Sequence, residues 1–350
     1  MQLTDDTLTA ASRALERGYS FALMCKGNDA SVFVCDDNSG RTPRSQQRFF
    51  VSPWPCRSVT FINDAVSAGE LLQLPPAASK APLPEPWPTS TDKSQYLQKV
   101  GALVEELRHT GGKTVISRTL CGELSIPVTE AFARLCRANP EAVCCLMFTH
   151  EHGCWLTATP ELLLSADGTQ LHTMSLAGTR RADATADWDD KNIAEQRMVT
   201  DWIMGRLADV GLQPCAQPVT TVCTSTVQHL CTPITARKNS ATEALDVCLA
   251  LAPTPAVCGA PQALAIERIA KIESHQRRLY SGFFGIAHTP GNMEAYVTLR
   301  CAQLSHSEYC IYAGGGITAM SVPADEWTET ALKAKSLLQI LCHSKNLQTA

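Results

Sequence analysis

The sequence contains no apolar run as long as the roughly 20 residues that a membrane-spanning helix requires. It also contains no run of basic residues, and its formal net charge is −4. Binding to nucleic acid or to an anionic membrane through a charged face is therefore not expected. Residues 1–27 lack the basic start and apolar run of a secretory signal. Together these absences predict a cytoplasmic protein.

A disulfide framework is not expected either, although the chain has 16 cysteines. They are scattered and stand mostly inside apolar runs such as VCCLMF and VCLALAP, which is typical of buried, reduced thiols. Cys144-Cys145 and His150-Glu151-His152 are close in sequence, but their spacing is wrong for a metal site. The second group is typical of a hairpin turn.

Nucleotide-binding motifs are missing as well. No Gly-Lys-Ser or Gly-Lys-Thr follows the glycine run at 314–316, and the run lacks GxGxxG spacing. It could form a tight strand-to-helix turn, or its bare amides could hold an anion ahead of a helix N-terminus. A second glycine turn, SLAGTRR at 175–181, carries two arginines, and TLRC places Arg300 in a predicted strand. With the acids described below, these features favour a small substrate that carries several negative charges.

The composition is that of a globular protein with a substantial core. Hydrophobic residues make up 45% of the 350 residues and charged residues 18%, and the length suits one large domain or two ordinary ones. Residues 74–90 contain six prolines. This segment is therefore predicted to be an extended connector rather than a helix or a central strand.

Residue patterns predict an α+β fold built on large antiparallel sheets. The predicted helices lie at about 4–17, 91–110, 187–210, 240–251, 261–271 and from 323 onward. The predicted strands are FALMC, SVFVC, RFFVS, KTVISRTL, AVCCLMFTH, CWLTAT, ELLLSADG, QLHTMSL, a run near 217–223, FFGIAH, MEAYVTLRCAQL and EYCIYAG. The turns HEHG and SADG join neighbouring strands, which indicates antiparallel pairing.

Two ionisable residues stand at the starts of apolar strands, Lys113 in KTVISR and Glu161 in TPELLL. Each has an ordinary interpretation as a solvated residue at a strand end. In the functional interpretation both face a cleft. Burial there lowers the pKa of Lys113 until it can act as a base, and it keeps Glu161 protonated as a general acid. Sequence context alone leaves both interpretations open.

Three further acids stand on predicted helices. Glu195 lies mid-helix in DKNIAEQRMV, whereas Glu326 and Glu329 share a helical stripe with Lys333 in DEWTETALK. The simplest interpretation is a surface face with an ordinary Glu329–Lys333 helix pair. Two carboxylates from separate helices would also suit magnesium, which prefers one or two carboxylates, several waters and a substrate anion.

Read in order, eight segments resemble the chorismate-utilising enzymes, the family of the isochorismate, salicylate, anthranilate and aminodeoxychorismate synthases. The segments are PELLL, SLAGTRR, QHLCTPI, APTPAVCGAP, YSGFFG, TLRCAQL, YAGGGIT and EWTETALK. The similarity covers about residues 91–342 with order and spacing kept, and before the connector only RFFVSPW is similar. The resemblance implies one chorismate-binding domain over 1–350, with a variable part at 1–73 and a catalytic core at 91–342. It also implies two large antiparallel sheets wrapped by helices, with the substrate in the cleft between them.

The resemblance further implies a magnesium ion and a set of site residues. The family's metal carboxylates fall on Glu195 and Glu329, with Glu326 supporting them. Its substrate-binding positions fall on Gly178, Thr179, His229, Arg300, Gly314 and Lys333. Under this interpretation the glycines let backbone amides approach a substrate carboxylate, and the helix after them brings one metal ligand and one cation.

Three features are similar to the isochorismate synthase branch of the family. Lys113 matches the lysine of the members that use water, whereas the members that use ammonia tend to have glutamine there. Ala177 stands where aminodeoxychorismate synthase has a nucleophilic lysine, and PTPAVCG differs from the PxGTxTG of anthranilate enzymes. The prediction is an isomerase that converts chorismate reversibly to isochorismate. Lys113 takes a proton from water attacking C2, and Glu161 protonates the departing C4 hydroxyl.

Two alternatives accompany this prediction. Salicylate synthase would go on to eliminate pyruvate in the same pocket, and a non-enzymatic relative would only bind chorismate. The predicted pathway is menaquinone biosynthesis, because no carrier-docking extension is obvious, with a siderophore pathway as the alternative. No amidotransferase subunit is expected, since water replaces ammonia. Ala252 and Gln196 depart from the family pattern, because each replaces a histidine.

Overall fold

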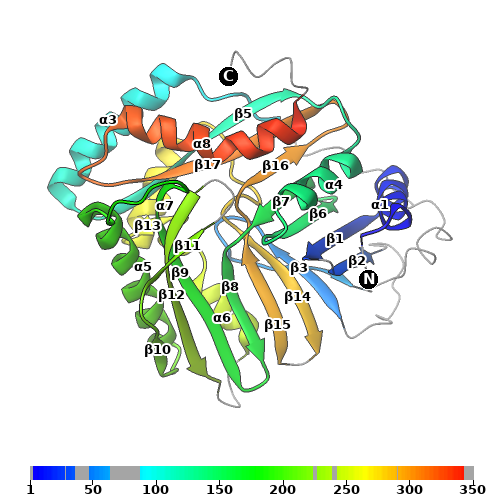
Figure 1. Ribbon diagram of the computed structural model, residues 1–350, viewed down its shortest axis with the longest axis horizontal. Coiled ribbons are helices and arrows are strands. Elements are labelled where there is room, and N and C mark those ends of the chain that lie inside the picture. Colours follow the sequence, from blue (N-terminus) through cyan, green and yellow to red (C-terminus); the bar gives the residue numbers. More distant parts are fainter. Residues whose placement is uncertain are drawn as a thin grey trace.

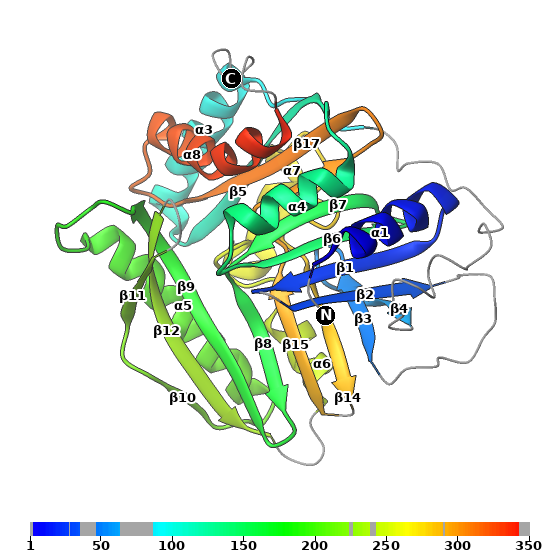
Figure 2. The ribbon, with the colours of Figure 1, turned by 45° about the vertical axis from the view of Figure 1, so that its right-hand side comes forward.

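The strands of the protein form two large antiparallel sheets (Figures 1 and 2). The computed structural model describes residues 3–27, 29–35, 47–63, 87–223, 227–238, 243–289 and 291–342. Helices cover the outer faces of both sheets, so the predicted α+β fold is confirmed. Most of the predicted proline-rich connector lies outside the described residues, and the proposed limits of the N-terminal part and the core stay predictions. None of the helices in the described ranges is long and apolar enough to cross a membrane.

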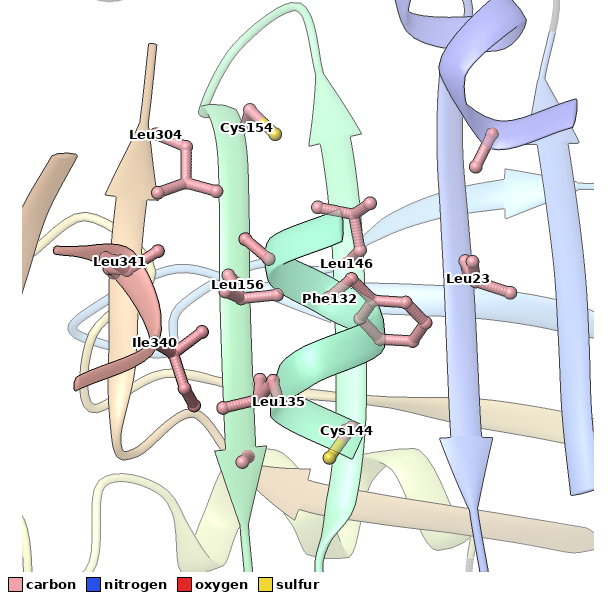
Figure 3. Close-up of a cluster of buried hydrophobic side chains, with 14 of the residues drawn as sticks. Leu23, Phe132, Leu135, Cys144, Leu146, Cys154, Leu156, Leu304, Ile340 and Leu341 are labelled. Atoms are coloured by element: carbon pink, nitrogen blue, oxygen red, sulfur yellow. The ribbon is translucent and has the colours of Figure 1, made fainter. Parts of the chain in front are cut away.

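The first sheet has eight strands in the order β13-β5-β17-β16-β7-β6-β1-β2. Their bounds are β13 Gly259–Ala260, β5 Lys113–Glu123, β17 Glu308–Ile317, β16 Cys301–Leu304, β7 Gly153–Thr159, β6 Val143–Thr149, β1 Ser20–Lys26 and β2 Asp29–Cys35. Three helices pack on its outer face: α1 (Asp5–Arg17), α4 (Val128–Ala138) and α8 (Pro323–Leu341). In Figure 3, Phe132 and Leu135 of α4 lie against Leu146 and Leu156 of the sheet, with Ile340 and Leu341 of α8 beside them.

The strands of this sheet are apolar on both faces because both faces are buried. Along β6, Cys144 and Leu146 face the helices, whereas Cys145 and Met147 face the second sheet. The inner layer also contains Trp155, packed among residues of both sheets. This double burial explains why the sequence reads as continuous apolar runs rather than as alternating ones.

The second sheet has nine strands, in the order β10-β12-β9-β8-β15-β14-β3-β4 with β11 paired to β12. Their bounds are β10 Pro214–Ala216, β12 Val227–Arg237, β9 Gln170–Arg181, β8 Leu162–Asp167, β15 Asn292–Val297, β14 Phe283–Thr289, β3 Arg48–Ser52, β4 Thr60–Asn63 and β11 Thr220–Cys223. Helices α5 (Asp190–Asp209) and α6 (Ala244–Leu251) cover it. Helices α3 (Lys93–Thr110) and α7 (Gln262–Ile272) pack around the ends of β5 and β17.

Two of the passages from one sheet to the other lie next to each other. At one, β7 of the first sheet leads into β8 of the second, and at the other β15 leads back to β16. The crossings are hydrogen-bonded to each other, since Val297 N donates to Glu161 O over 3.1 Å and Ala158 N donates to Arg300 O over 3.2 Å. The predicted single run MEAYVTLRCAQL is therefore wrong: it forms two strands, and Arg300 lies in the break between them.

Other predicted elements also differ from the structure. Helix α4 was not predicted, and it begins after Pro127 without a side-chain cap, so the usual start signal is missing. Strand β12 was not predicted either; it contains Pro233, which argues against a strand inside a sheet. The run 314–316 is not a turn, because it lies inside β17, between β5 and β16.

Gly285 in β14 offers a test of how tightly the second sheet is packed. A Cβ atom at Gly285 would overlap the carbonyl oxygen of Glu294 and stand 2.6 Å from Phe50 Cζ. Gly285→Ala should therefore lower the free energy of unfolding by about 1–3 kcal/mol in urea denaturation. The control is Gly205→Ala on the exposed face of α5, where a Cβ atom meets nothing within 4 Å. That variant should gain about 0.5–1 kcal/mol, and equal stabilities for the two variants would contradict the packing.

Candidate active site

A cavity of about 110 Å³ lies between the two sheets, beside the crossings. Its size suits a small metabolite rather than a dinucleotide. Most of the predicted site residues line it: Glu161, Gly178, Thr179, Glu195, His229, Arg300, Gly314 and Lys333. A larger hollow of about 670 Å³ lies between α1 and the β5–α4 connection, but its lining is largely apolar and includes none of these residues. The convergence of charged groups therefore identifies the smaller cavity as the candidate site.

The glycine run of β17 gives space to side chains from other elements. A Cβ atom at Gly314 would overlap the hydroxyl of Tyr280, and one at Gly316 would stand 2.6 Å from Lys113 Cε and 3.0 Å from Glu195 Oε1. At Gly315, on the opposite face of the strand, a Cβ atom would stand 2.8 Å from Glu326 Oε2. The glycines are needed because charged side chains approach both faces of this strand.

Each of the three predicted metal carboxylates forms an ion pair with a lysine. Glu195 Oε1 of α5 accepts from Lys113 Nζ over 2.6 Å, and Glu329 Oε1 of α8 accepts from Lys333 Nζ over 2.7 Å. The third pair joins Glu326 to Lys191 at 3.2 Å. Lys113 does not line the cavity; it lies behind Glu195 and is only 1% exposed. Its interpretation as a solvated strand-end residue is therefore wrong.

Neighbouring charges balance the cost of burial in this cluster. Burial opposes ionisation of Glu329, but Lys333 in contact, with Lys191 and Lys113 beyond, lowers the pKa of this carboxyl. Burial likewise opposes the charged form of Lys333, and Glu329 with Glu195 raises its pKa. For Glu326, burial and then Glu329 raise the pKa, with Lys191 opposing them.

Glu161 stands at the first crossing and is 5% exposed. Burial raises the pKa of Glu161 to about 7, although the positive charges of Lys113, Arg300 and Lys333 oppose this shift. A carboxyl with this pKa is largely protonated just below neutral pH and can donate a proton there. These three cations also lie close enough to Glu161 for their charges to act on it, so the predicted acid and base belong to one electrostatic cluster.

His229 on β12 connects the second sheet to Arg300. Burial lowers the pKa of His229 to about 4, with the charges of Arg300 and Lys333 acting in the same direction, so the ring is neutral near pH 7. Its Nδ1 lies 2.9 Å from the carbonyl oxygen of Gly178, which can only accept, so Nδ1 carries the proton. Nε2 is then the acceptor for Arg300 Nη2 at 3.2 Å. A neutral histidine thus holds the guanidinium in the cavity.

Arg300 itself occupies an uncommon backbone conformation. Its φ is 45°, in the left-handed region that a residue with a Cβ atom rarely adopts. The hydrogen bonds of the crossing hold it there, because Leu299 O accepts from Thr157 Oγ1 at 2.7 Å and Arg300 O accepts from Ala158 N. Such strained residues occur often at functional sites. This conformation is the reason that the strand pattern wrongly placed Arg300 inside a continuous strand.

A second buried network supports the cavity wall, and sequence reasoning missed it. Arg277 is 2% exposed and its Nη2 donates to Glu273 Oε1 and to Val115 O, both over 2.6 Å. Arg277 Nη1 donates to Val257 O over 2.8 Å, so one guanidinium fixes the backbone of two lining residues. The aromatic rings of Tyr280 and Tyr312 stack at the same wall. Only the YSGFFG motif, which begins at Tyr280, gave a sequence signal for this region.

The carboxylates fit a magnesium site of modest size. Glu195 and Glu329 come from separate helices. The charges of both carboxylates act on Lys333, and the charges of Lys333 and Lys113 act on Glu329, so these groups form one cluster. One or two carboxylates that leave space for water and a substrate anion are what magnesium prefers. Within the part of the chain that the structure describes, no three His, Cys, Asp or Glu side chains are grouped closely enough to hold a metal. Glu326 approaches the strand at Gly315, on the opposite face from Glu195, and one of its buried oxygens lacks a hydrogen-bond partner.

The two departures from the family pattern have ordinary structural roles. Gln196 is buried, and its Nε2 donates to Ser175 O and Oγ and to Thr232 Oγ1. It therefore ties α5 to β9 and β12 directly next to Glu195. Ala252 belongs to the apolar cluster beneath α6. Neither residue lines the cavity.

Comparison with known proteins identifies the family. The pattern of the chorismate binding enzymes matches residues 25–339. Isochorismate synthase EntC of Escherichia coli (strain K12) is 32% identical over 244 residues, which cover 65% of this chain. The match spans only 62% of the length of EntC. The putative isochorismate synthase MenF of Mycobacterium tuberculosis (strain ATCC 25618 / H37Rv) is 33% identical over 298 residues, or 77% of each chain.

Solved structures share the fold. MenF, the menaquinone-specific isochorismate synthase from Escherichia coli, aligns with a TM-score of 0.76 and 23% identity, covering 97% of this chain and 92% of its own. The putative 2,3-dihydroxybenzoate-specific isochorismate synthase DhbC from Bacillus anthracis aligns with a TM-score of 0.74 and 22% identity, covering 95% and 99%. With the match over residues 25–339, the chain belongs to the chorismate binding enzyme family.

Proposed function

We propose that the protein is an isochorismate synthase, which adds water at C2 of chorismate and removes the C4 hydroxyl. The observation that carries the proposal is a cavity lined by a buried carboxyl of raised pKa, Glu161, and by the cations Arg300 and Lys333, with the buried Lys113 paired to Glu195 behind its wall. Substrate and product are isomers of similar energy, so the reaction should run in both directions. The isochorismate synthases among the relatives support the same activity.

The cavity supplies cations for a substrate that carries carboxylates. Arg300, held by neutral His229, can present its remaining N–H groups to a carboxylate in a forked geometry. Lys333 Nζ donates to Gly314 O over 3.0 Å and contacts Glu329 Oε1 at 2.7 Å. It contributes a second positive charge. Backbone groups of Gly178, Thr179 and Gly314 complete the proposed binding surface. Two cations on different walls would orient a ring between them.

Glu161 is the proposed general acid. Its environment favours the protonated carboxyl up to about pH 7, where it can donate to the departing C4 hydroxyl. Arg300 and Lys333 oppose the shift, so they keep the pKa from rising further and make deprotonation feasible after the transfer. A group that gives up a proton and regains it at neutral pH suits a reversible isomerisation.

Lys113 is the proposed general base for the attacking water. Its Nζ lies 2.6 Å from Glu195 Oε1, so it must leave this contact before it can take a proton from water. The base is therefore available once Glu195 releases it, for which the neighbouring Gly316 leaves space.

Glu195 and Glu329 are the proposed magnesium ligands, with Glu326 supporting them. When bound, magnesium would neutralise the negative charge of the substrate carboxylate. We place the enzyme in menaquinone biosynthesis, since a relative named MenF is 33% identical over 77% of each chain. We also propose that it works in the cytoplasm and without an amidotransferase subunit.

The proposed activity is tested by incubating the protein with chorismate and identifying the products. We expect isochorismate, formed only with magnesium present and approached from either direction. Ammonia should not be required, and no amino-substituted product should appear. Salicylate with pyruvate would instead identify a salicylate synthase, and unchanged chorismate with measurable binding would identify a binding protein. Full turnover in excess chelator would contradict the proposed role of magnesium.

The acid and base are tested by Lys113→Gln and Glu161→Gln. Each should lower turnover by about 100- to 10,000-fold, and the double variant should be far less than multiplicatively worse. The wild-type rate should fall as pH rises through the Glu161 pKa of about 7, because the proposed acid then loses its proton. The control is Lys26→Gln, an exposed strand-end lysine paired with Glu294, which should keep normal turnover. Near-normal rates in Lys113→Gln would remove Lys113 from the mechanism.

The metal site is tested by Glu329→Gln, which keeps the side-chain volume and removes one charge. Its magnesium affinity, measured by calorimetric titration, should fall by at least tenfold while the protein stays folded. Glu130→Gln on α4 is the matched control, because Glu130 also pairs with a residue four positions later, Arg134, at 2.8 Å. If the titration curve of Glu329→Gln overlays that of the control, Glu329 serves only as half of a helix ion pair.

A further inference from the structure

Cys121 and Cys310 face each other across β5 and β17, the strand pair that also carries Lys113 and the glycine run. They are direct partners in the antiparallel register, so both side chains lie on the same face of the sheet. Directly opposite residues have Cα atoms about 4.5–5.5 Å apart, which lies within the range that a disulfide can bridge. The two thiols are in hydrogen-bonding contact. Their geometry therefore permits a bond between them with little movement of the backbone.

The two thiols differ in accessibility and in acidity. Cys310 is fully buried, whereas Cys121 is partly exposed beside residues 88–90. Cys121 Sγ donates to Pro88 O over 3.2 Å, and its amide donates to Ser90 Oγ over 2.8 Å. The hydrogen bond from Cys310 lowers the pKa of Cys121, while the same contact and burial raise the pKa of Cys310. The accessible sulfur is thus the better nucleophile, and the buried one is placed behind it.

The other thiol contacts lack this combination. Cys25 and Cys144 are also direct partners, across β1 and β6, but both are buried. The contact with Cys136, together with burial, raises the pKa of Cys25. Cys215 and Cys223 are exposed, but they lie on β10 and β11, which are not paired with each other. Cys136 is also partly exposed and contacts Cys144 and Cys25, but the contact with Cys144 and burial raise its pKa. Among the described cysteines, only the pair Cys121 and Cys310 joins a partly exposed thiol of lowered pKa to a thiol directly opposite on the neighbouring strand.

We propose that Cys121 and Cys310 form a redox-active dithiol that a hydroperoxide converts into a cross-strand disulfide. The sulfur of Cys121 attacks one peroxide oxygen, the O–O bond breaks, and the leaving hydroxide takes a proton to become water. Cys310 then attacks the resulting sulfenic acid, which forms the S–S bond and releases a second water. Two thiols are oxidised by two electrons, and hydrogen peroxide is reduced to two molecules of water.

The disulfide would cross-link the wall of the candidate cavity. Tyr312 lies two residues from Cys310 on the same face of β17, and it stacks against Trp155 and Tyr280. Closing the bond also takes Cys121 Sγ away from the Pro88 carbonyl, so the segment before α3 loses one of its contacts with β5. The oxidation state of this pair therefore acts on the strands that support the site.

The test maps the oxidised thiols in the full-length protein. Reduced protein is treated with a small molar excess of hydrogen peroxide, quenched with catalase, alkylated with N-ethylmaleimide under denaturing conditions and analysed by peptide mass spectrometry. We expect Cys121 and Cys310 to lose alkylation together, two of the 16 thiols, and to appear in one linked peptide that dithiothreitol separates. Cys215 and Cys223, although more exposed, should react more slowly.

Two variants distinguish the roles of the thiols. In Cys121→Ser, Cys310 should stay fully alkylated at the same peroxide dose. In Cys310→Ala, Cys121 should accumulate as a sulfenic acid that dimedone traps. The proposal is overturned if wild-type Cys121 and Cys310 both stay alkylated while Cys215 and Cys223 are oxidised. A linked peptide joining Cys25 to Cys144 instead would overturn it as well. The wild-type map decides the question even if the buried Cys310→Ala substitution prevents folding.

Discussion

The hydrogen-bonded double crossing between the sheets is the constraint on which the site depends. Where β7 passes into β8 and β15 passes into β16, each crossing forms hydrogen bonds with backbone groups of the other. This arrangement fixes Glu161 in the buried inner layer and holds the partly buried Arg300 outside regular strand geometry. The raised pKa of Glu161 and the left-handed backbone of Arg300 both follow from it. The two side chains are thus positioned by connections whose backbones are hydrogen-bonded to each other.

Buried charge is tolerated around the cavity because the described ionised groups there are paired. Isolated buried charges are strongly unfavourable, whereas paired and hydrogen-bonded ones are not. Glu195 and Lys333 line the cavity and pair with Lys113 and Glu329, and Arg277 with Glu273 stiffens its wall from behind. The glycines of β17 make the first pairing feasible by leaving space beside the strand. Ion pairs that can exchange partners also suit a site that must accept an anionic substrate.

The sequence predicted much of this architecture. The two antiparallel sheets, the helix near Asp92 with its cap, and the hairpins at HEHG and SADG were all found. Three features were not found, and each breaks a local rule. Helix α4 lacks a capping side chain, β12 contains a proline, and the break at Arg300 interrupts a run of strand-forming residues. Local patterns could not indicate them, because contacts with distant segments stabilise these conformations.

In the site, too, some features follow from the sequence and others only from the tertiary structure. Sequence alone determined the residue types and the contacts that are local, such as Glu329 with Lys333, which a helix brings together four positions apart. Only the tertiary structure decided that Glu195 would meet Lys113, that Glu326 would lie on the other side of the strand, and that Glu161 would hold its proton near neutral pH. The physical reason is that ion pairing and protonation depend on burial and on neighbouring charges. Both are supplied by segments far away along the chain.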